Sequence, residues 1–438
     1  MSISIVSSTQ SAMTPPRLNP LSTWLQARPT TEDTMLLALR DRAETWLQES
    51  SFPTTRDEAW RFTDLSGLAG LTPIAPTELE SQAVESLCTD AETRLLLANG
   101  RYHAALSNLD GSLAKVYIGP WSQASAAVRD RVVTAIARHT NAHKPFAALN
   151  AASTDELGIV WLGAGAIVET PISLMSVTEA GDQATIANTR FIVVAEANSS
   201  ATIIEEFITV GTRSGEIVSN AAIDLHLGEN AEIQHVTLQR EGETSSHIHH
   251  IDVTQARDSR YASHVITLGA ALSRQEIEVM QAGAGTATTL NSLTIVGETQ
   301  LADTHTSVVL NHPHSTIDQL CKCIVGDRAR TVFDGRIVVG QQAQQTRADQ
   351  LNRNLLLSPK ARVNTKPQLE IVADDVKCSH GATVSQLEAD ELFYLQSRGL
   401  DRQLSTSLLV DAFAAEVLEQ LPTEAIRDAI TARVLTRT

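Results

Sequence analysis

The sequence predicts a mainly β protein whose core is a parallel β-helix, with helical regions before and after it. Residues 156–381 form a succession of short β-branched runs separated by Gly, Asn, Asp and Ser, without helical patterns of useful length between them. Within this region a polar turn followed by a strand recurs every 26 to 30 residues, around Ala201, Ala231, Tyr261, Ala287, Ser315 and Ala343. Such a period is typical of stacked coils that share one continuous core, whereas a β-sandwich has frequent turns but needs no longer period.

Residues 1–155 predict a mainly helical N-terminal region. Residues 34–47 place Met35, Leu36, Leu39, Ala43, Trp46 and Leu47 at helical spacing. A second amphipathic helix is expected over 126–137, and Pro145 is placed to open a short third helix that continues to Asn150. The first residues are rich in Ser and Thr and lack the basic and apolar segments of a secretory signal, so we expect a disordered tail.

Residues 382–438 predict a helical C-terminal region. Ser385 and Glu388 have the spacing of a capping box, and the helix that follows is expected to stop at Gly399. A second helix carries an apolar stripe that we interpret as a packing face: Leu404, Leu408, Ala412, Ala415 and Leu418. A third helix, capped by Thr423, carries Ile426, Ile430 and Val434. Such a tail could cap the open end of the β-stack or dock a partner.

Composition narrows the functional classes. Lys and Arg number 34 against 51 Asp and Glu, so the net charge is −17, which argues against nucleic acid or an anionic membrane surface as a partner. Four cysteines in 438 residues do not form a disulfide framework, and a reducing cytoplasm is the expected compartment, with the plastid stroma as an alternative. The sequence contains no apolar run of the ~18 residues that a membrane span needs.

The most informative short segment is Asp374–Thr383, which contains Cys378 and His380. Residues two apart on a strand point to the same face, so the thiol and the imidazole should share one surface. Both groups are metal ligands, but two ligands do not make a site. From local sequence alone a buried thiol and a hydrogen-bonded histidine is therefore the simpler interpretation, and a metal site here needs ligands from a partner subunit.

Two other groups of potential ligands are weaker. Cys321 and Cys323 should face the same side of a strand, as a metal pair, a redox pair or small cysteines that fill the solenoid interior, and we favour the last. His247 and His249 should also share a face, beside His250, and we interpret this run as an exposed strand ladder rather than a metal site.

The chain lacks the phosphate-binding loop of NTPases and the nucleophile elbow of α/β-hydrolases. A β-helix carbohydrate-active enzyme is an alternative reading of the fold, but the adjacent Asp374 and Asp375 would point to opposite faces of a strand and do not form an acid/base pair.

Several segments together resemble the SufB/SufD family of iron–sulfur cluster assembly proteins. They are 332–337, 343–346, 355–358, 367–371, 374–383 and 392–399, and the N-terminal run 57–65 (Asp-Glu-Ala-Trp-Arg-Phe-Thr-Asp-Leu) resembles the SufD branch. The resemblance spans most of the chain and is densest from about 330 to 400. It implies a right-handed parallel β-helix between helical ends, and Cys321 and Cys323 are not part of the family pattern, so they receive no role from it.

The resemblance also implies a function. Members of this kind are non-catalytic scaffold subunits that pair with a SufB-type subunit and bind a SufC-type ATPase, so that a nascent iron–sulfur cluster forms at the interface. His380 would be a ligand there, with Cys378 beside it, and no tightly bound cofactor is expected on the isolated chain. Residues matching the ATPase-docking region are Leu392, Phe393, Tyr394, Leu395, Arg398 and Gly399.

Two further possibilities follow. Without the SufB-type subunit the same exposed strands could form a homodimer. A stand-alone metal- or redox-binding β-solenoid that uses its own His and Cys clusters is the alternative function.

Overall fold

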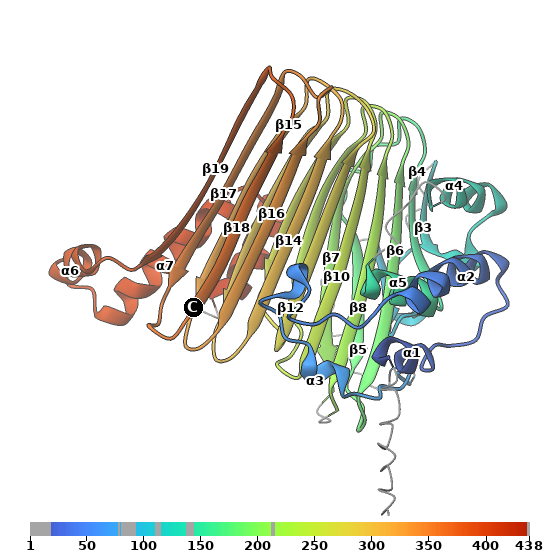
Figure 1. Ribbon diagram of the computed structural model, residues 1–438, viewed down its shortest axis with the longest axis horizontal. Coiled ribbons are helices and arrows are strands. Elements are labelled where there is room, and N and C mark those ends of the chain that lie inside the picture. Colours follow the sequence, from blue (N-terminus) through green and yellow to red (C-terminus); the bar gives the residue numbers. More distant parts are fainter. Residues whose placement is uncertain are drawn as a thin grey trace, which may run out of the picture.

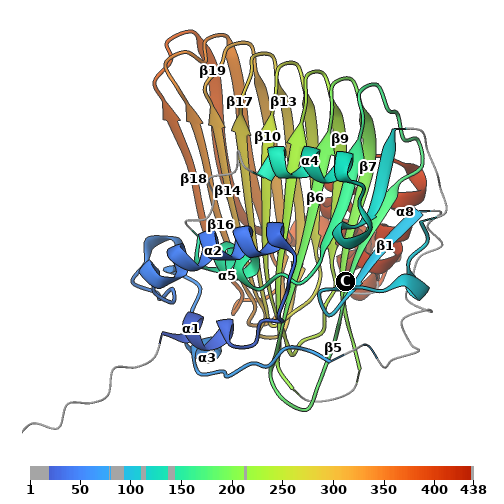
Figure 2. The ribbon, with the colours of Figure 1, turned by 90° about the vertical axis from the view of Figure 1, so that its right-hand side faces the viewer.

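The computed structural model describes residues 19–77, 79, 93–109, 115–136, 144–211 and 215–435. Two long sheets face each other, and successive strands from β4 to β19 alternate between them, which makes eight turns of a parallel β-solenoid (Figure 1). Helices flank the solenoid near both ends of the chain (Figure 2). The predicted fold class is therefore confirmed, whereas the expected N-terminal tail lies outside the described residues.

The nine-stranded sheet contains, in spatial order, β18 (Arg362–Ile371), β16 (Arg330–Val339), β14 (Leu301–Leu310), β12 (Leu272–Gln281), β10 (Ser245–Gln255), β8 (Ile217–Leu227), β6 (Thr185–Ala195), β4 (Leu157–Leu162) and β3 (Val116–Pro120). The ten-stranded sheet contains β19 (Val376–Gln386), β17 (Thr346–Leu356), β15 (Thr316–Val325), β13 (Ala287–Val296), β11 (Arg260–Thr267), β9 (Glu232–Gln239), β7 (Ser200–Val210), β5 (Ile172–Glu179), β1 (Thr93–Ala98) and β2 (Arg101–Tyr102). Only β1–β2 and β3–β4 pair antiparallel among these strands.

The repeat seen in the sequence has a structural cause at one corner of each coil. The residue that turns the chain into the ten-stranded sheet repeatedly has a positive φ: Asn198, Asn230, Asp258, Gly285, His314 and Gln345. Asn, Asp and Gly tolerate this left-handed conformation better than most residues, which explains the polar turns. Asn230 also donates its side-chain amide to the Asn198 side chain of the preceding coil at 2.8 Å. Each coil therefore turns at an equivalent position.

Most of the N-terminal region packs on the outer face of the nine-stranded sheet, whereas Leu106 packs against β1, β5 and β7 of the ten-stranded sheet. Its elements are α1 (Pro20–Leu25), α2 (Thr34–Glu49), η1 (Glu58–Trp60), α3 (Ser66–Ala69), η3 (Ala104–Leu106), η4 (Trp121–Gln123), α4 (Ala126–Ile136) and α5 (Pro145–Ser153). The helices expected near 34–47, 126–137 and 145–150 are all present. Trp24 and Phe146 lie in one buried cluster with Ile192 and Ile248 of the sheet, so this region shares a core with the solenoid wall.

The C-terminal helices α6 (Ala389–Ser397), α7 (Arg402–Leu418) and α8 (Glu424–Leu435) follow β19 directly. Ser385 belongs to β19 and the N-cap of α6 is Glu388, so the expected capping box is wrong, whereas the Thr423 cap is confirmed by its hydroxyl accepting from the Ile426 amide at 3.2 Å. The helices α7 and α8 pack on the outer face of the ten-stranded sheet. They flank the solenoid and leave its last coil, formed by β18 and β19, without a cap.

The expected packing stripe of α7 is largely wrong. Leu404 and Leu408 are 47% and 43% exposed, and the buried face of the helix instead contains Val410, Ala414, Val417 and Leu418. Nothing on α6 is buried. The apolar residues of α6 and of the first turns of α7 therefore form an unpacked surface.

The interior of the solenoid contains a continuous aliphatic core and, beside it, a group of buried polar side chains. Aliphatic residues such as Ile203, Ile233 and Val308 form one continuous core along the stack. His247 and His249 face the same interior and are 0% exposed, and His250 is 3% exposed beside Glu276, so the expectation of an exposed strand ladder is wrong for all three. They contact buried carboxylates: His249 Nε2 lies 3.3 Å from Glu205, and His247 Nδ1 lies 2.8 Å from Glu241.

Candidate functional site

The free end of the solenoid is its last coil. The strands β18 and β19 each have a neighbour on one side only, so their outer backbone groups are unpaired within the described chain (Figure 1). Ile371, Val372 and Val384 on this coil are 45%, 61% and 51% exposed. A long unpaired edge with exposed apolar side chains is a template to which another chain can add.

Cys378 and His380 lie on β19 with their side chains toward the solenoid interior. In the register of β19 and β17, Cys378 lies opposite Ala348, which is fully buried, and His380 lies opposite Gln350, which is 2% exposed. Cys378 packs against the apolar core, while His380 is exposed at the open end. The predicted shared face is therefore confirmed.

Cys378 and His380 differ in burial and in their availability to bind a metal. Burial raises the pKa of the Cys378 thiol above its usual value, so Cys378 is a neutral thiol at neutral pH. His380 is exposed and free to present a ring nitrogen to another molecule. No group of three or more His, Cys, Asp or Glu residues that could hold a metal ion occurs within the described ranges. Within the described residues, Cys378 and His380 therefore do not complete a metal site by themselves.

A second surface is the helical face of α6 and α7. Phe393 and Tyr394 are 72% and 58% exposed, and Leu404 and Leu408 continue the apolar surface onto α7. Arg398 lies over the Tyr394 ring, 5.2 Å from its centroid. Gly399 has a φ of +93° and no side chain to strain, which ends α6 as predicted. Leu392 and Leu395 are only partly buried. The predicted docking residues therefore lie in one unpacked segment.

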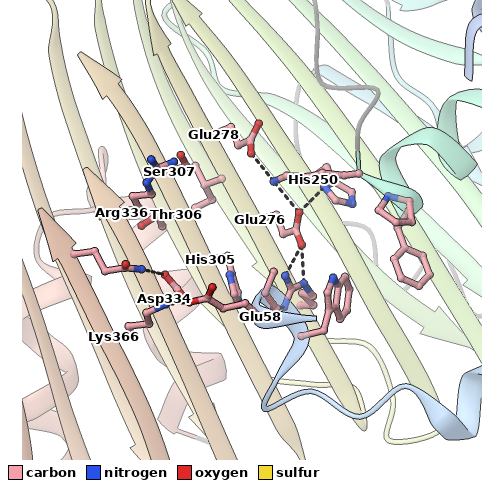
Figure 3. Close-up of a pocket in the computed structure, with 18 of the residues that line it drawn as sticks. Glu58, His250, Glu276, Glu278, His305, Thr306, Ser307, Asp334, Arg336 and Lys366 are labelled. Atoms are coloured by element: carbon pink, nitrogen blue, oxygen red, sulfur yellow. Dashed lines mark hydrogen bonds and ion pairs between the residues drawn. The ribbon is translucent and has the colours of Figure 1, made fainter. Parts of the chain in front are cut away.

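A groove of about 570 Å³ runs between the N-terminal region and the outer face of the nine-stranded sheet (Figure 3). Arg274 on β12 is 1% exposed at its floor and forms ion pairs with Glu276, at 2.6 Å, and with Asp303. Its guanidinium lies 3.7 Å from the centroid of the Trp60 ring, and it donates to the Ala59 carbonyl at 3.1 Å. One buried cation thus ties the N-terminal segment to two strands.

The other charges of the groove are paired as well. Lys144 lies 2.8 Å from Glu276 and 2.6 Å from Glu278, and these carboxylates raise the pKa of Lys144 despite its burial. Lys366 on β18 lies 2.6 Å from Glu58 (Figure 3). Because each cation already has an anionic partner, this groove fastens the 57–65 segment to the solenoid rather than offering a free charge to a ligand.

The sequence did not predict these contacts between the 57–65 segment and Arg274 and Asp303, which we call the Arg274 clasp. Thr63 Oγ1 donates to Asp303 Oδ2 at 2.5 Å across 240 positions of sequence. The run 57–65 was recognised only as a family pattern, and its structure shows why Trp60 and Thr63 matter: both contact the Arg274–Asp303 pair. The isolated charges on β12 and β14 carry no sequence signal that identifies them as its partners.

Comparison with known proteins agrees with this architecture. Residues 177–413 match the family model described as "SUF system FeS cluster assembly, SufBD core domain". The chain is 38% identical over 418 residues to the iron–sulfur cluster assembly SufBD family protein slr0076 of Synechocystis, covering 93% of this chain and 92% of that protein. It is 32% identical over 393 residues to the iron–sulfur cluster assembly protein SufD of Escherichia coli, covering 89% and 90%. It is also 34% identical to the chloroplastic protein ABCI7 of Arabidopsis thaliana over 409 residues, covering 90% and 84%.

The fold defines a parallel β-solenoid protein with helical ends and an uncapped last coil. The chain belongs to the SufB/SufD family of iron–sulfur cluster assembly proteins and is SufD-like. The family's expected solenoid between helical ends is the architecture observed here.

Proposed function

We propose that this chain is a non-catalytic scaffold subunit that pairs through β18 and β19 with a SufB-type subunit and carries a SufC-type ATPase on α6 and α7. The observation that carries the proposal is the last coil, which combines two free strand edges with His380 and Cys378 at its open end. The nascent cluster is cargo held between the two subunits, with His380 supplying a ligand from this side.

The absence of a complete ligand set among the described residues supports a shared site. Two potential ligands cannot satisfy an iron–sulfur cluster, which is usually held by four protein ligands. A site divided between subunits can also open when the subunits move, which lets the finished cluster leave. The alternative of a stand-alone metal-binding solenoid would need further ligands from this chain.

The second surface supports a separate partner. Phe393, Tyr394, Leu404 and Leu408 lie on α6 and α7 rather than on the strands β18 and β19, so this surface can bind a second partner. ATP-driven movement of a partner on this tail would act on the last coil, because α6 follows β19 after two residues.

Within the described residues no helix is long and apolar enough to cross a membrane. We place the complex in the cytoplasm, and the plastid named for the Arabidopsis relative is the alternative compartment.

Co-purification with both partner types tests the proposal. The full chain should retain both, and a chain that ends at Gln386, after β19, should keep the SufB-type partner and lose the ATPase. As the matched variant, Val384→Glu on the free edge should lose the SufB-type partner and keep the ATPase. Loss of both partners with either variant, while the chain remains folded by circular dichroism, would contradict two separate surfaces.

A further inference from the structure

We propose that Gln350 is the residue that positions His380: its amide oxygen accepts a hydrogen bond from Nδ1–H of the imidazole and leaves Nε2 to bind the metal. This inference rests on the proposed function, because it assigns a supporting residue to the same ligand. It begins from a buried oxygen atom on β17 that has no hydrogen-bond partner.

Gln350 lies at the end of a row of hydrogen-bonded side chains inside the solenoid. Its amide nitrogen donates to Oε1 of Gln319 at 2.9 Å, and the Gln319 nitrogen donates in turn to the Thr306 hydroxyl of the facing sheet at 2.9 Å. This row fixes the Gln350 amide, since its nitrogen is occupied on the side of Gln319. The oxygen is therefore left for the side of β19, the next strand.

The Gln350 oxygen has no donor on the facing sheet. Gln350 is 2% exposed, and its Oε1 atom is buried. The two residues that follow Thr306 across the nine-stranded sheet are Gly335 and Pro367, and neither has a side chain that can donate. A buried acceptor without a donor is unfavourable, so this oxygen needs a donor from another direction.

Gly335 leaves the room in which the Gln350 amide lies. A Cβ atom at position 335 would come within 2.5 Å of the Gln350 nitrogen and within 2.5 Å of Cζ of the buried Phe333 ring. A glycine within a strand often marks such a close approach. The segment 332–337, one of those that resemble the family, therefore contains a residue that keeps the Gln350 amide in place.

His380 is the side chain that the fold places next to this oxygen. It lies opposite Gln350 in the pairing of β17 and β19, just as Gln350 lies opposite Gln319 one coil earlier. The Gln350–Gln319 hydrogen bond already spans the same strand spacing of about 4.8 Å. In the rotamer that the structure shows, the His380 ring is exposed and does not bond to the Gln350 oxygen. Exposed side chains change rotamer within nanoseconds, so the ring can turn to it.

A histidine and a glutamine are already bonded in this way in an earlier coil. His249 of β10 lies opposite Gln275 of β12, and its Nδ1 atom lies 3.0 Å from the Gln275 amide oxygen. An amide oxygen can only accept, so Nδ1 carries the proton there. The two side chain types therefore reach each other from paired strands of this solenoid.

The hydrogen bond decides which ring nitrogen meets the metal. A neutral imidazole has one N–H and one lone pair, and the nitrogen with the lone pair binds a metal ion. With the proton held on Nδ1 by the Gln350 oxygen, Nε2 of His380 carries the lone pair. Histidines that bind metals almost always donate their other N–H to an acceptor, and loss of that acceptor typically costs about 10- to 100-fold in affinity or activity.

Nuclear magnetic resonance of the isolated full chain, labelled with nitrogen-15 histidine, tests the hydrogen bond without any metal. At about pH 8.5 an ordinary histidine, with a pKa of about 6.5, is neutral, and the ring nitrogen shifts distinguish Nδ1–H from Nε2–H. The His380 signals are those that His380→Ala lacks. The wild-type ring should be mainly Nδ1–H, and Gln350→Met should lose this preference. Gln350→Glu, whose protonated side chain can both donate and accept, should restore it.

Asn354→Leu is the matched control. Asn354 is a buried amide on the same face of β17, but it lies opposite Val384 instead of His380. This variant should leave the His380 signals as in the wild type. In complex with the SufB- and SufC-type partners under anaerobic conditions, Gln350→Met should form the cluster about 10- to 100-fold more slowly, whereas Gln350→Glu and Asn354→Leu should form it at the wild-type rate.

Three results would overturn the assignment of Gln350. They are a wild-type ring that is mainly Nε2–H, His380 signals that Gln350→Met leaves unchanged or Asn354→Leu changes equally, and a wild-type rate of cluster formation in Gln350→Met. The first needs no variant, so it decides the question even where Gln350→Met does not fold. Failure of the proposed function would look different: His380→Ala would form the cluster normally while the wild-type ring still showed Nδ1–H.

Discussion

His380 lies directly opposite Gln350 in the register of β19 and β17, and so continues the interior row of the solenoid onto its open end. Gln350 is buried and donates to Gln319 at 2.9 Å, whereas His380 has no further coil above it. A side chain that would be interior in any earlier coil is thus presented to a partner by the end of the stack.

The Arg274 clasp should contribute strongly to stability. Arg274→Ala would remove the buried cation that Glu276 and Asp303 share, leaving Glu276 with Lys144 and Asp303 with His305, and removal of one member of a buried ion pair typically costs about 3–5 kcal/mol. Urea unfolding followed by circular dichroism measures this loss. The control is Arg336→Ala, which breaks a half-exposed pair with Glu370 and should cost no more than about 1 kcal/mol. An equal loss of unfolding free energy in Arg274→Ala and Arg336→Ala would contradict a strong contribution of Arg274 to stability.

Gly158 on β4 should not tolerate a side chain. A Cβ there would lie 2.3 Å from Cδ1 of Phe191, a fully buried ring that cannot move freely. Gly158→Ala should lower the free energy of unfolding by about 1–3 kcal/mol through overpacking. Gly67→Ala is the matched control, because no atom lies within 4 Å of its Cβ position and alanine favours the helix α3. Thermal unfolding of both variants checks this, and a neutral Gly158→Ala would show that the core is not rigid there.

Glu205 should make stability depend on acid pH. Its two histidine neighbours lower the pKa of Glu205 to about 2 against the opposing effect of burial. Ionised Glu205 therefore contributes stability fully above its ordinary pKa of 4.5, and this contribution, roughly 3 kcal/mol, is lost as the pH falls toward 2.

Glu205→Gln tests this dependence directly. Between pH 5 and pH 2, its free energy of unfolding should fall less steeply than that of the wild type, as measured by denaturant titration at each pH. Glu229→Gln changes a 63% exposed carboxylate and should retain the wild-type slope. If the free energy of unfolding of Glu205→Gln fell with pH as steeply as that of the wild type, Glu205 would not be the cause of the acid dependence.

The exposed apolar surface of α6 and α7 should contribute to the affinity for a partner but little to the stability of the fold. Phe393→Ala removes a ring that is 72% exposed, so the unfolding midpoint should stay within experimental error. Affinity for the SufC-type ATPase should fall by about 2 kcal/mol or more, as expected for an aromatic residue central to an interface. Calorimetric titration measures the affinity, and Met280→Ala, an exposed apolar residue on the solenoid wall, serves as the control. Unchanged affinity would place the ATPase elsewhere.

The solenoid could be predicted because its cause is local and repeated. Each coil needs a left-handed corner such as Asn198 or Asp258 and strands of similar length, 8 to 11 residues from β5 to β19, and both recur in the sequence. The shared face of Cys378 and His380 was predictable for the same reason, since it follows from strand geometry alone.

Long-range partners were not predictable. Thr63 and Asp303 meet only after five coils, from β4 to β13, have been stacked between their positions in the chain, and nothing near either residue indicates the other. The helix α7 has two apolar faces, and which one meets the ten-stranded sheet depends on the orientation of the helix, so Leu404 was assigned to the wrong face. The burial of His247 and His249 depends on Glu241 and Glu205. Nothing in the sequence near the histidines indicates these partners.

The role of the last coil in cluster assembly is tested most directly by cluster formation with His380→Ala in complex with the SufB- and SufC-type partners under anaerobic conditions, followed by absorbance and iron content. His380 is exposed at the open end, so the variant should fold and assemble with its partners as the wild type does. This intact complex should form little or no cluster, while Gln368→Ala on the neighbouring strand β18 should form it normally. Wild-type cluster formation by His380→Ala would contradict the assignment of the last coil as the site of assembly.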